Sequence, residues 1–312
     1  MPELPDIELY LHVLRKRVHG ATLTNIRLKS AFLLRSVEPP LSALHGKRVL
    51  GLERLGKRVV FAFEDELFMV VHLMVAGRFQ WKGLGAAVPG RMGLAAFDFE
   101  RGDSEDDSYE SGTLLLTEAS KKKRARLHVV RGRAAMEEHD AGGAEPLGMS
   151  QEEFESVLCE KNHTVKRALT DPRIFSGIGN AYSDEILFVA KLPPTRWTSR
   201  LKPEDIDALH EATQKVLNES RDRLIEEVGE GWPKKVTAFR PEMAVHGKYG
   251  EPCPVCAEPV QRIRYADNET NYCAKCQNGG KLLADRGLSR LLKGDWPKTL
   301  DALELMKRER KS

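Results

Sequence analysis

Apolar residues near the start of the chain recur at the spacing of one helix face. These positions are Ile7, Tyr10, Leu11, Leu14 and Val18. Pro5 stands ahead of all of them, at a position suited to a first helical turn, and Gly20 follows them as a stop signal. The pattern predicts an amino-terminal helix.

Beyond this helix, from Thr22 to about Val130, the pattern changes to short runs rich in valine, leucine and phenylalanine. Glycine and acidic turn signals separate the runs. The clearest ones cover 48–52, 59–63, 67–71, 114–117 and 127–130. Closely spaced short runs of this kind are typical of an antiparallel sandwich or barrel. We therefore expect a β-rich domain directly after the helix.

The second half of the chain has a different pattern. Residues 137–149 contain glycines and a Glu-Pro pair and predict a linker. Helical spacing then dominates from Gln151 to about Glu227, with breaks at 175–180 and 191–194. Residues 228–245 show no clear periodicity, and we expect a mobile loop there.

Composition agrees with a soluble protein of several domains. The chain has 312 residues, of which 41% are hydrophobic and 30% charged. It contains neither a membrane-length apolar run nor a signal-peptide pattern, so we expect a cytoplasmic protein, nucleoid-associated in a bacterium. The net charge of +3 does not by itself indicate nucleic acid binding. However, Lys121 to Arg133 hold seven bases and no acid, which predicts a phosphate-contacting strand or hairpin.

Two Cys-x-x-Cys knuckles give the strongest metal signal. They are formed by Cys253 with Cys256 and by Cys273 with Cys276. This spacing is typical of one zinc ion held by four thiolates in a tetrahedron. Such a site has no open coordination position, so we expect the zinc to be structural. The fifth cysteine, Cys159, lies in an apolar helical pattern and is expected to be an inert buried thiol.

The first residues offer a candidate nucleophile. If the initiator methionine is removed, Pro2 carries a free secondary amine, and the ordinary pKa of an α-amino group is about 8. Such an amine can attack an electrophilic carbon. Glu3 lies beside it, although an acid there also suits the dipole of the following helix.

Four separated motifs, taken in this order, resemble the formamidopyrimidine-DNA glycosylase and endonuclease VIII family. They are Pro2-Glu3, the lysine segment 54–58, the glycine-rich segment 176–185 and the four-cysteine finger. The resemblance covers residues 1–277. It implies a bifunctional DNA glycosylase and abasic-site lyase of base excision repair, acting on oxidised or ring-opened bases in double-stranded DNA. We expect a monomer without membrane contact.

The resemblance also implies a multidomain α+β fold. A helix and a catalytic β-sandwich would occupy residues 1–135, and a DNA-binding helix–two-turn–helix domain would occupy 150–230. The zinc finger would cover 245–277, and residues 278–312 would form an extension.

Site residues follow from the same resemblance. Pro2 would form a Schiff base with the deoxyribose, and Glu3 would act as general acid on the sugar ring oxygen. Lys57, with Arg58 beside it, would bind the phosphate next to the lesion. Gly179 would let the backbone approach a second phosphate, and Asn180 would donate to it at a helix start.

Three departures from the family pattern concern the residues that hold opened DNA. Val75 stands where a void-filling methionine is expected, and residues 118–123 replace the segment that supplies an arginine and a phenylalanine wedge. Met74 and Lys121 are the candidates that remain near these places. Asn268 stands where the finger has a phosphate-binding arginine, and Arg262 or Arg264 are candidate substitutes.

These departures support a second hypothesis, a catalytically weak protein of the same fold that binds damaged or distorted DNA. The preserved Pro2, Glu3, Lys57 and Asn180 favour the enzyme. A zinc-ribbon regulator of transcription would leave Pro2-Glu3 unexplained.

Overall fold

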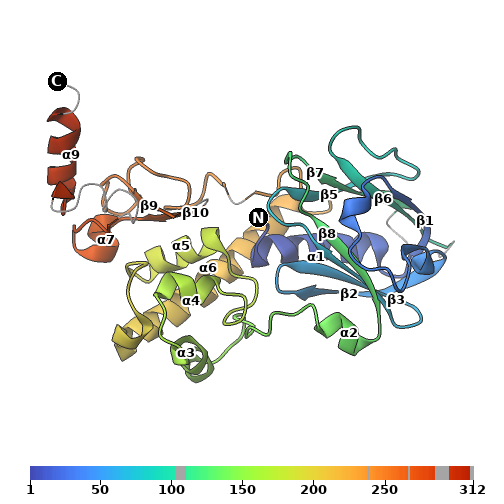
Figure 1. Cartoon of the computed structure of the whole chain (residues 1–312), viewed down its shortest axis with the longest axis horizontal. Helices are drawn as coiled ribbons and strands as arrows, with labels where there is room; N and C mark the ends of the chain where they lie inside the picture. The colour runs from blue at the N-terminus through green and yellow to red at the C-terminus, as the bar shows by residue number, and fades with distance from the viewer. Residues whose placement is uncertain (103–109, 238, 266–267, 285–294, 310–312) are drawn as a thin grey trace. The chain divides into compact units, whose positions relative to one another are not determined.

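The structure, a computed structural model, describes residues 1–102, 110–237, 239–265, 268–284 and 295–309 (Figure 1). The chain forms two compact units. Unit 1 comprises Met1–Gly142 and Ser220–Ala238, and unit 2 comprises Gly143–Glu219 and Phe239–Ser312. Among the described helices, none is long and apolar enough to cross a membrane.

Unit 1 begins with helix α1 (Leu4–Val18), as the apolar spacing predicts. Pro5 lies in its first turn, where a missing N–H costs no helical hydrogen bond. Gly20, just beyond the end, has a φ of 81°, a conformation that glycine adopts readily.

An eight-stranded antiparallel sheet follows. Its strands are β1 (Thr22–Leu28), β2 (Lys47–Leu55), β3 (Arg58–Phe63), β4 (Leu67–His72), β5 (Gly77–Gly83), β6 (Gly93–Glu100), β7 (Gly112–Glu118) and β8 (Arg126–Arg131). Their order is β5-β7-β6-β1-β2-β3-β4-β8. The two four-stranded halves are joined where Thr22 and Leu23 pair with Arg48 and Lys47. Each predicted run lies within one strand, and the β-sandwich is confirmed.

The core of unit 1 lies between α1 and the two halves of the sheet. It also receives a later segment of the chain, because Leu224 and Val236 are buried in the same cluster. The indole N–H of Trp232 donates to the Phe79 carbonyl at 3.2 Å. Residues 232–236 form no helix or strand, as expected of a loop, but Val236 is buried in the core and Trp232 packs against it, so this part of the loop is held in place.

Unit 2 contains the predicted helices and the finger. Its elements are α3 (Gln151–Cys159), α4 (Val165–Thr170), α5 (Asn180–Val189), the start of α6 (Pro203–Val228), the hairpin β9 (Gln261–Tyr265) and β10 (Asn268–Tyr272), α7 (Ala274–Asn278) and α9 (Leu300–Glu309). The expectation of a buried Cys159 is wrong, since this residue ends α3 and is exposed. Phe154 and Leu158 provide the buried face of that helix.

Candidate active site and metal centre

The amino terminus of unit 1 is buried in the protein. Pro2 is buried and Glu3 is only 3% exposed. Glu3 is the N-cap of α1, and its backbone N–H donates to the Asp6 carboxylate at 2.9 Å. The helix start therefore holds both predicted catalytic residues in fixed positions.

Burial lowers the pKa of the amine at this end of the chain, which is that of Met1. Glu3 and Asp6 oppose the shift, whereas Arg78 and Lys57 reinforce it. Desolvation and nearby cations both disfavour a protonated amine. The surroundings of the Met1 amine therefore favour its unprotonated form.

Arg78 is a cation close to the terminal amine that the sequence analysis missed. It is the second residue of β5, and its guanidinium donates to the carbonyls of Val75 at 3.1 Å and Gly77 at 2.6 Å. These bonds fix a cation close enough to act on the terminal amine. The only sequence signal was an arginine directly after the turn 73–77.

Lys57 lies in the two-residue turn between β2 and β3. Gly56 has a φ of 59°, which suits the first position of a type II′ turn. Arg54 donates from Nε to Glu8 of α1 at 2.8 Å and from Nη1 to the Gly56 carbonyl at 3.0 Å. Arg54 therefore connects the amino-terminal helix to the turn that carries Lys57.

Beside this turn, a row of basic side chains crosses three strands. Arg58 of β3 lies opposite His72 of β4, which lies opposite Arg126 of β8. Burial lowers the pKa of His72 to about 4, and the charges of Arg58, Lys57 and Arg126 contribute to the lowering. Burial also lowers the pKa of Arg58. Such a row favours an anion as its ligand.

The turn from Leu73 to Gly77 presents Val75 at its tip. Val75 is 51% exposed, whereas Met74, with a φ of 54°, is half-buried. Gly77 cannot be replaced without moving the backbone, because an added Cβ would lie 2.2 Å from the Leu73 carbonyl oxygen. The more exposed apolar side chain at this tip is thus the valine.

The basic segment from Lys121 to Arg133 forms a strand only over β8. Residues 119–125 are a loop around the buried carboxylate of Glu118, which accepts from the backbone N–H groups of Arg124 and Ala125 at 2.9 to 3.1 Å. Lys123 donates to the Glu118 carbonyl. Lys121 is exposed on this loop, so the predicted strand or hairpin is wrong for its position.

In unit 2 the glycine-rich loop leads directly into α5. Gly177 has a φ of 80°, which glycine adopts without strain. Gly179 is the N-cap of α5 and Asn180 its first residue. The Asn180 side-chain amide donates to the Glu269 carbonyl of the finger hairpin at 2.6 Å.

Two buried acids of α5 connect this helix to the finger. The Asp184 carboxylate accepts hydrogen bonds from Lys166 at 2.5 Å and from the Asn271 N–H at 3.1 Å. It is also hydrogen-bonded to His246 Nδ1 at 2.8 Å. Glu185 accepts three consecutive N–H groups, those of residues 244–246, at 2.7 to 3.0 Å. Burial raises the pKa of Glu185 despite these bonds. Both acids therefore serve to hold the finger against α5.

On the finger hairpin, Arg262 and Arg264 lie on β9. Each guanidinium is 3.3 Å from the same carboxylate oxygen of Glu269. Arg262 also stacks over the Tyr249 ring at 4.0 Å. Asn268 begins β10 and is exposed.

The four knuckle cysteines meet at one place. The sulfurs of Cys253, Cys256, Cys273 and Cys276 all lie within 4.8 Å of one another. Four sulfurs at about 2.3 Å from a zinc ion would lie about 3.8 Å apart, so the cluster fits a tetrahedral metal site. Its donors are thiolates, which suit zinc.

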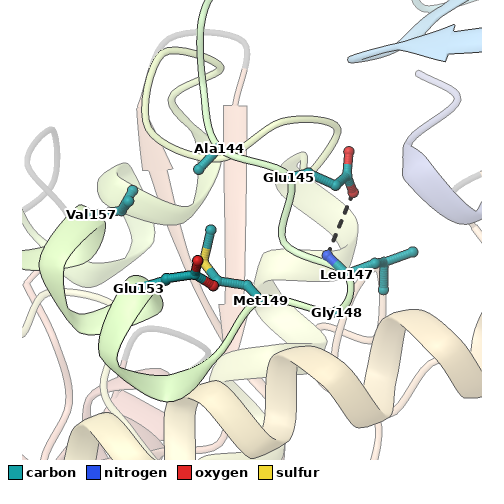
Figure 2. Close-up of a pocket in the computed structure, with 7 residues that line it drawn as sticks. All are labelled: Ala144, Glu145, Leu147, Gly148, Met149, Glu153 and Val157. Carbon is teal, nitrogen blue, oxygen red and sulfur yellow. Dashed lines mark hydrogen bonds between the residues drawn. The ribbon is translucent and has the colours of Figure 1, made fainter.

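A hollow of about 410 Å³ lies elsewhere in unit 2, between α3 and residues 144–149 (Figure 2). Glu145 turns its carboxylate toward the Leu147 N–H at 3.5 Å, and Glu153 lies on the opposite wall. Glu153 already accepts from the Ser150 N–H at 2.9 Å as part of a helix cap. None of the predicted site residues lines this hollow.

Three parts of the chain match known domain families. Residues 1–136 match the formamidopyrimidine-DNA glycosylase N-terminal domain, and residues 143–225 match the H2TH domain of the same glycosylase. Residues 250–279 match the zinc finger found in FPG and IleRS.

Individual relatives agree with these matches. A formamidopyrimidine-DNA glycosylase-like protein of Mycobacterium tuberculosis is 40% identical over 151 residues, covering 48% of this chain and 94% of the relative. The formamidopyrimidine-DNA glycosylase of Solibacter usitatus is 29% identical over 89% of this chain and 99% of its own length. The Lactococcus lactis Fpg, solved with abasic-site DNA, has the same fold, with a TM-score of 0.74 at 24% identity over 88% of this chain and 99% of that one.

Proposed function

Because the chain belongs to the formamidopyrimidine-DNA glycosylase family, we propose that it excises damaged bases from DNA and cleaves the strand at the resulting abasic site. One observation carries this proposal. The Pro2-Glu3 terminus is buried, and at this place in the fold burial, helped by Lys57 and Arg78, lowers the pKa of the Met1 amine that precedes Pro2. The substrate class is duplex DNA with an oxidised or ring-opened base, or with an abasic site.

The reaction begins at the Pro2 nitrogen, after removal of Met1. Its lone pair forms a bond to the deoxyribose C1′, the glycosidic bond electrons leave with the base, and the proton that the proline nitrogen then loses neutralises the departing base. Glu3 donates a proton to the sugar ring oxygen as the ring opens, which leaves an iminium between C1′ and the proline nitrogen. The iminium acidifies the adjacent sugar proton, whose removal expels the flanking phosphate. Water then hydrolyses the iminium and restores the amine.

The other predicted residues bind the DNA. Lys57 and Arg58 contact phosphate next to the lesion, and Gly179 and Asn180 contact phosphate at the start of α5. Met74, Lys121, Arg262, Arg264 and Asn268 remain proposed DNA contacts. We also propose the domain division 1–135, 150–230 and 245–277, with 278–312 as an extension, and a monomer as the active form.

A structural zinc ion completes the proposal. The four cysteine thiolates would hold it, and it would supply folding stability to the finger hairpin. The proposed nucleophile Pro2 and the proposed general acid Glu3 both belong to unit 1.

The test is covalent trapping. The full-length protein is incubated with a duplex that holds one abasic site and then reduced with borohydride, which converts an iminium to a stable amine. We expect an adduct that is lost in Pro2→Gly and in protein that retains Met1. Lys82→Met, which removes an exposed lysine amine, should leave the adduct unchanged. Glu3→Gln should abolish base release while DNA binding persists.

The second candidate is a catalytically weak protein that binds damaged or distorted DNA. Val75 and Asn268 favour it, since they stand where the family has a void-filling methionine and a phosphate-binding arginine. Binding to abasic-site DNA without any trapped adduct would select this candidate over the enzyme.

A further inference from the structure

Three proposed phosphate-binding side chains of unit 2 converge on one residue, Glu269 of β10. Asn180 donates to its carbonyl at 2.6 Å. Arg262 Nη1 and Arg264 Nε both lie 3.3 Å from its carboxylate oxygen Oε2. The Glu269 backbone carbonyl thus accepts from Asn180, and its carboxylate pairs with the two arginines.

The Glu269 carboxylate is held in place from the buried side of the hairpin. Its other oxygen accepts from the Asn271 side chain at 3.0 Å. Asn271 is only 2% exposed, and its side-chain oxygen accepts from the Gly247 N–H at 2.9 Å. Although desolvation alone would raise it, the pKa of Glu269 is lowered by the Asn271 and Arg264 hydrogen bonds and by the charges of Arg262 and Arg264. The carboxylate is therefore ionised at neutral pH.

The same groups are accessible to an external anion. Side-chain exposure is 30% for both Arg262 and Glu269 and 61% for Arg264. Stacking on Tyr249 keeps the Arg262 guanidinium in place. Guanidinium groups bind carboxylate and phosphate oxygens with the same charge-assisted geometry. A DNA phosphate and the Glu269 carboxylate therefore compete for these arginines.

We propose that the Glu269 carboxylate occupies, in the free protein, the place that a DNA backbone phosphate takes between Arg262 and Arg264. It thereby sets the affinity of the finger for DNA. This inference rests on the proposed function, because it takes DNA as the ligand. Asn268, where the family has its arginine, makes the two β9 arginines the cations of this site.

Neutralising Glu269 should strengthen DNA binding. In Glu269→Gln the two arginines keep their charges and no longer face the Glu269 carboxylate. Removing one negative charge about 6 Å from a bound phosphate, at an effective dielectric constant of about 40, corresponds to a gain on the order of tenfold at moderate salt. The slope of log Kd against log salt should steepen by about 0.9, the value for one more phosphate neutralised.

The experiment measures Kd by fluorescence anisotropy at several salt concentrations, with full-length metal-loaded protein. The probe is a duplex that contains one tetrahydrofuran abasic analogue. The matched control is Glu258→Gln, which removes the same charge from a finger carboxylate that pairs with Lys275 at 3.6 Å. We expect less than a twofold change for this control. Metal content and thermal melting report whether each variant is folded.

Two further variants complete the test. Glu269→Thr suits a strand position and should show the same gain if the glutamine variant loses metal. Adding Arg262→Gln and Arg264→Gln to Glu269→Gln should abolish the gain.

The possible outcomes distinguish the inference on Glu269 from the proposed enzymatic function. If wild type binds and the folded Glu269 variants bind equally or more weakly, the inference is overturned and the proposed function stands. If a folded variant binds more tightly but no protein yields a borohydride adduct, the inference stands and the enzyme is overturned. If neither wild type nor variants bind the duplex, both are overturned.

Discussion

Arg54 stabilises the arrangement of two segments of unit 1 through its hydrogen bonds. Its side chain is 8% exposed, and it joins Glu8 of α1 to the Gly56 carbonyl of the turn that carries Lys57. Three buried acids also connect separate parts of the chain, because their carboxylates accept from backbone N–H groups outside their own helix or strand. They are Glu118, Asp184 and Glu185. A buried carboxylate is stable only when its oxygens are bonded, so these acids define where the segments lie.

We expect Arg54→Gln to destabilise unit 1 by about 1–3 kcal/mol, since it leaves the Glu8 carboxylate and the Gly56 carbonyl without this donor. Base release should fall with it, because the Lys57 turn loses its link to α1. Urea unfolding and single-turnover excision measure the two effects. Arg48→Gln is the matched control, as its ion pair with Glu64 is exposed, with 57% and 37% of the side chains accessible. Equal losses in the two variants would contradict this role.

At the scale of elements, Arg58 and Arg126 place positive charge on β3 and β8, on either side of His72 of β4. An unfolded histidine has a pKa near 6.5, whereas burial and its cationic neighbours lower that of His72 to about 4. Between these pH values the unfolded state binds more protons than the folded state. The free energy of unfolding therefore decreases as pH falls from 6.5 to about 4.

The expected contribution of His72 to this decrease is about 3 kcal/mol in total, because a tenfold change in a proton-binding constant corresponds to about 1.4 kcal/mol. His72→Gln should flatten the dependence of unfolding free energy on pH across that window, as measured by denaturant titrations at several pH values. His45→Gln replaces an exposed histidine outside the row and should leave the dependence unchanged. An unaltered slope in His72→Gln would show that other groups cause the acid sensitivity.

The segment after α6 contributes to the core of unit 1 through Trp232. Its ring centroid lies 6.3 Å from that of Trp81 and 6.2 Å from that of Tyr10, and the Arg17 guanidinium lies 5.4 Å from its centre. Trp232→Ala should cost about 3 kcal/mol, the usual loss for a large aromatic core residue. Trp197→Ala, which removes a 45% exposed tryptophan of unit 2, should cost under about 1 kcal/mol. Comparable melting temperatures for the two variants would refute the packing role.

At the scale of the whole molecule, the chain passes between the two units three times, after Gly142, Glu219 and Ala238. Unit 1 contains the proposed catalytic terminus, and unit 2 contains the four cysteines. Loss of the metal should therefore affect the units differently.

We expect Cys276→Ser to lower metal content and to weaken DNA binding at least about tenfold, because metal binding stabilises the finger that carries Arg262 and Arg264. Hydrogen exchange should show lost protection in β9 and β10 and retained protection in the strands of unit 1. Cys159→Ser is the control, since this exposed cysteine lies outside the four-sulfur cluster. Retained finger protection without metal would contradict the expectation.

Local sequence patterns were sufficient to predict most of the helices and strands of this protein and its cysteine cluster. Apolar spacing determined α1, the β-sandwich and the helices of unit 2, because the period of burial follows directly from helix and strand geometry. Cysteine spacing likewise determined the four-sulfur cluster, since two short knuckles and a hairpin suffice to bring four sulfurs together. Pro2, Glu3, Lys57 and Asn180 could be predicted as site residues because they lie in short contiguous motifs.

Only the tertiary structure decided which distant groups meet. Arg78 lies near the terminal amine, Trp232 returns to the core of unit 1, and Glu269 holds Asn180 and two arginines. These contacts join residues far apart in the sequence, and each side chain alone would equally suit an exposed surface. The physical reason is that hydrogen bonds and charge pairs depend on distances between segments, which local spacing does not specify.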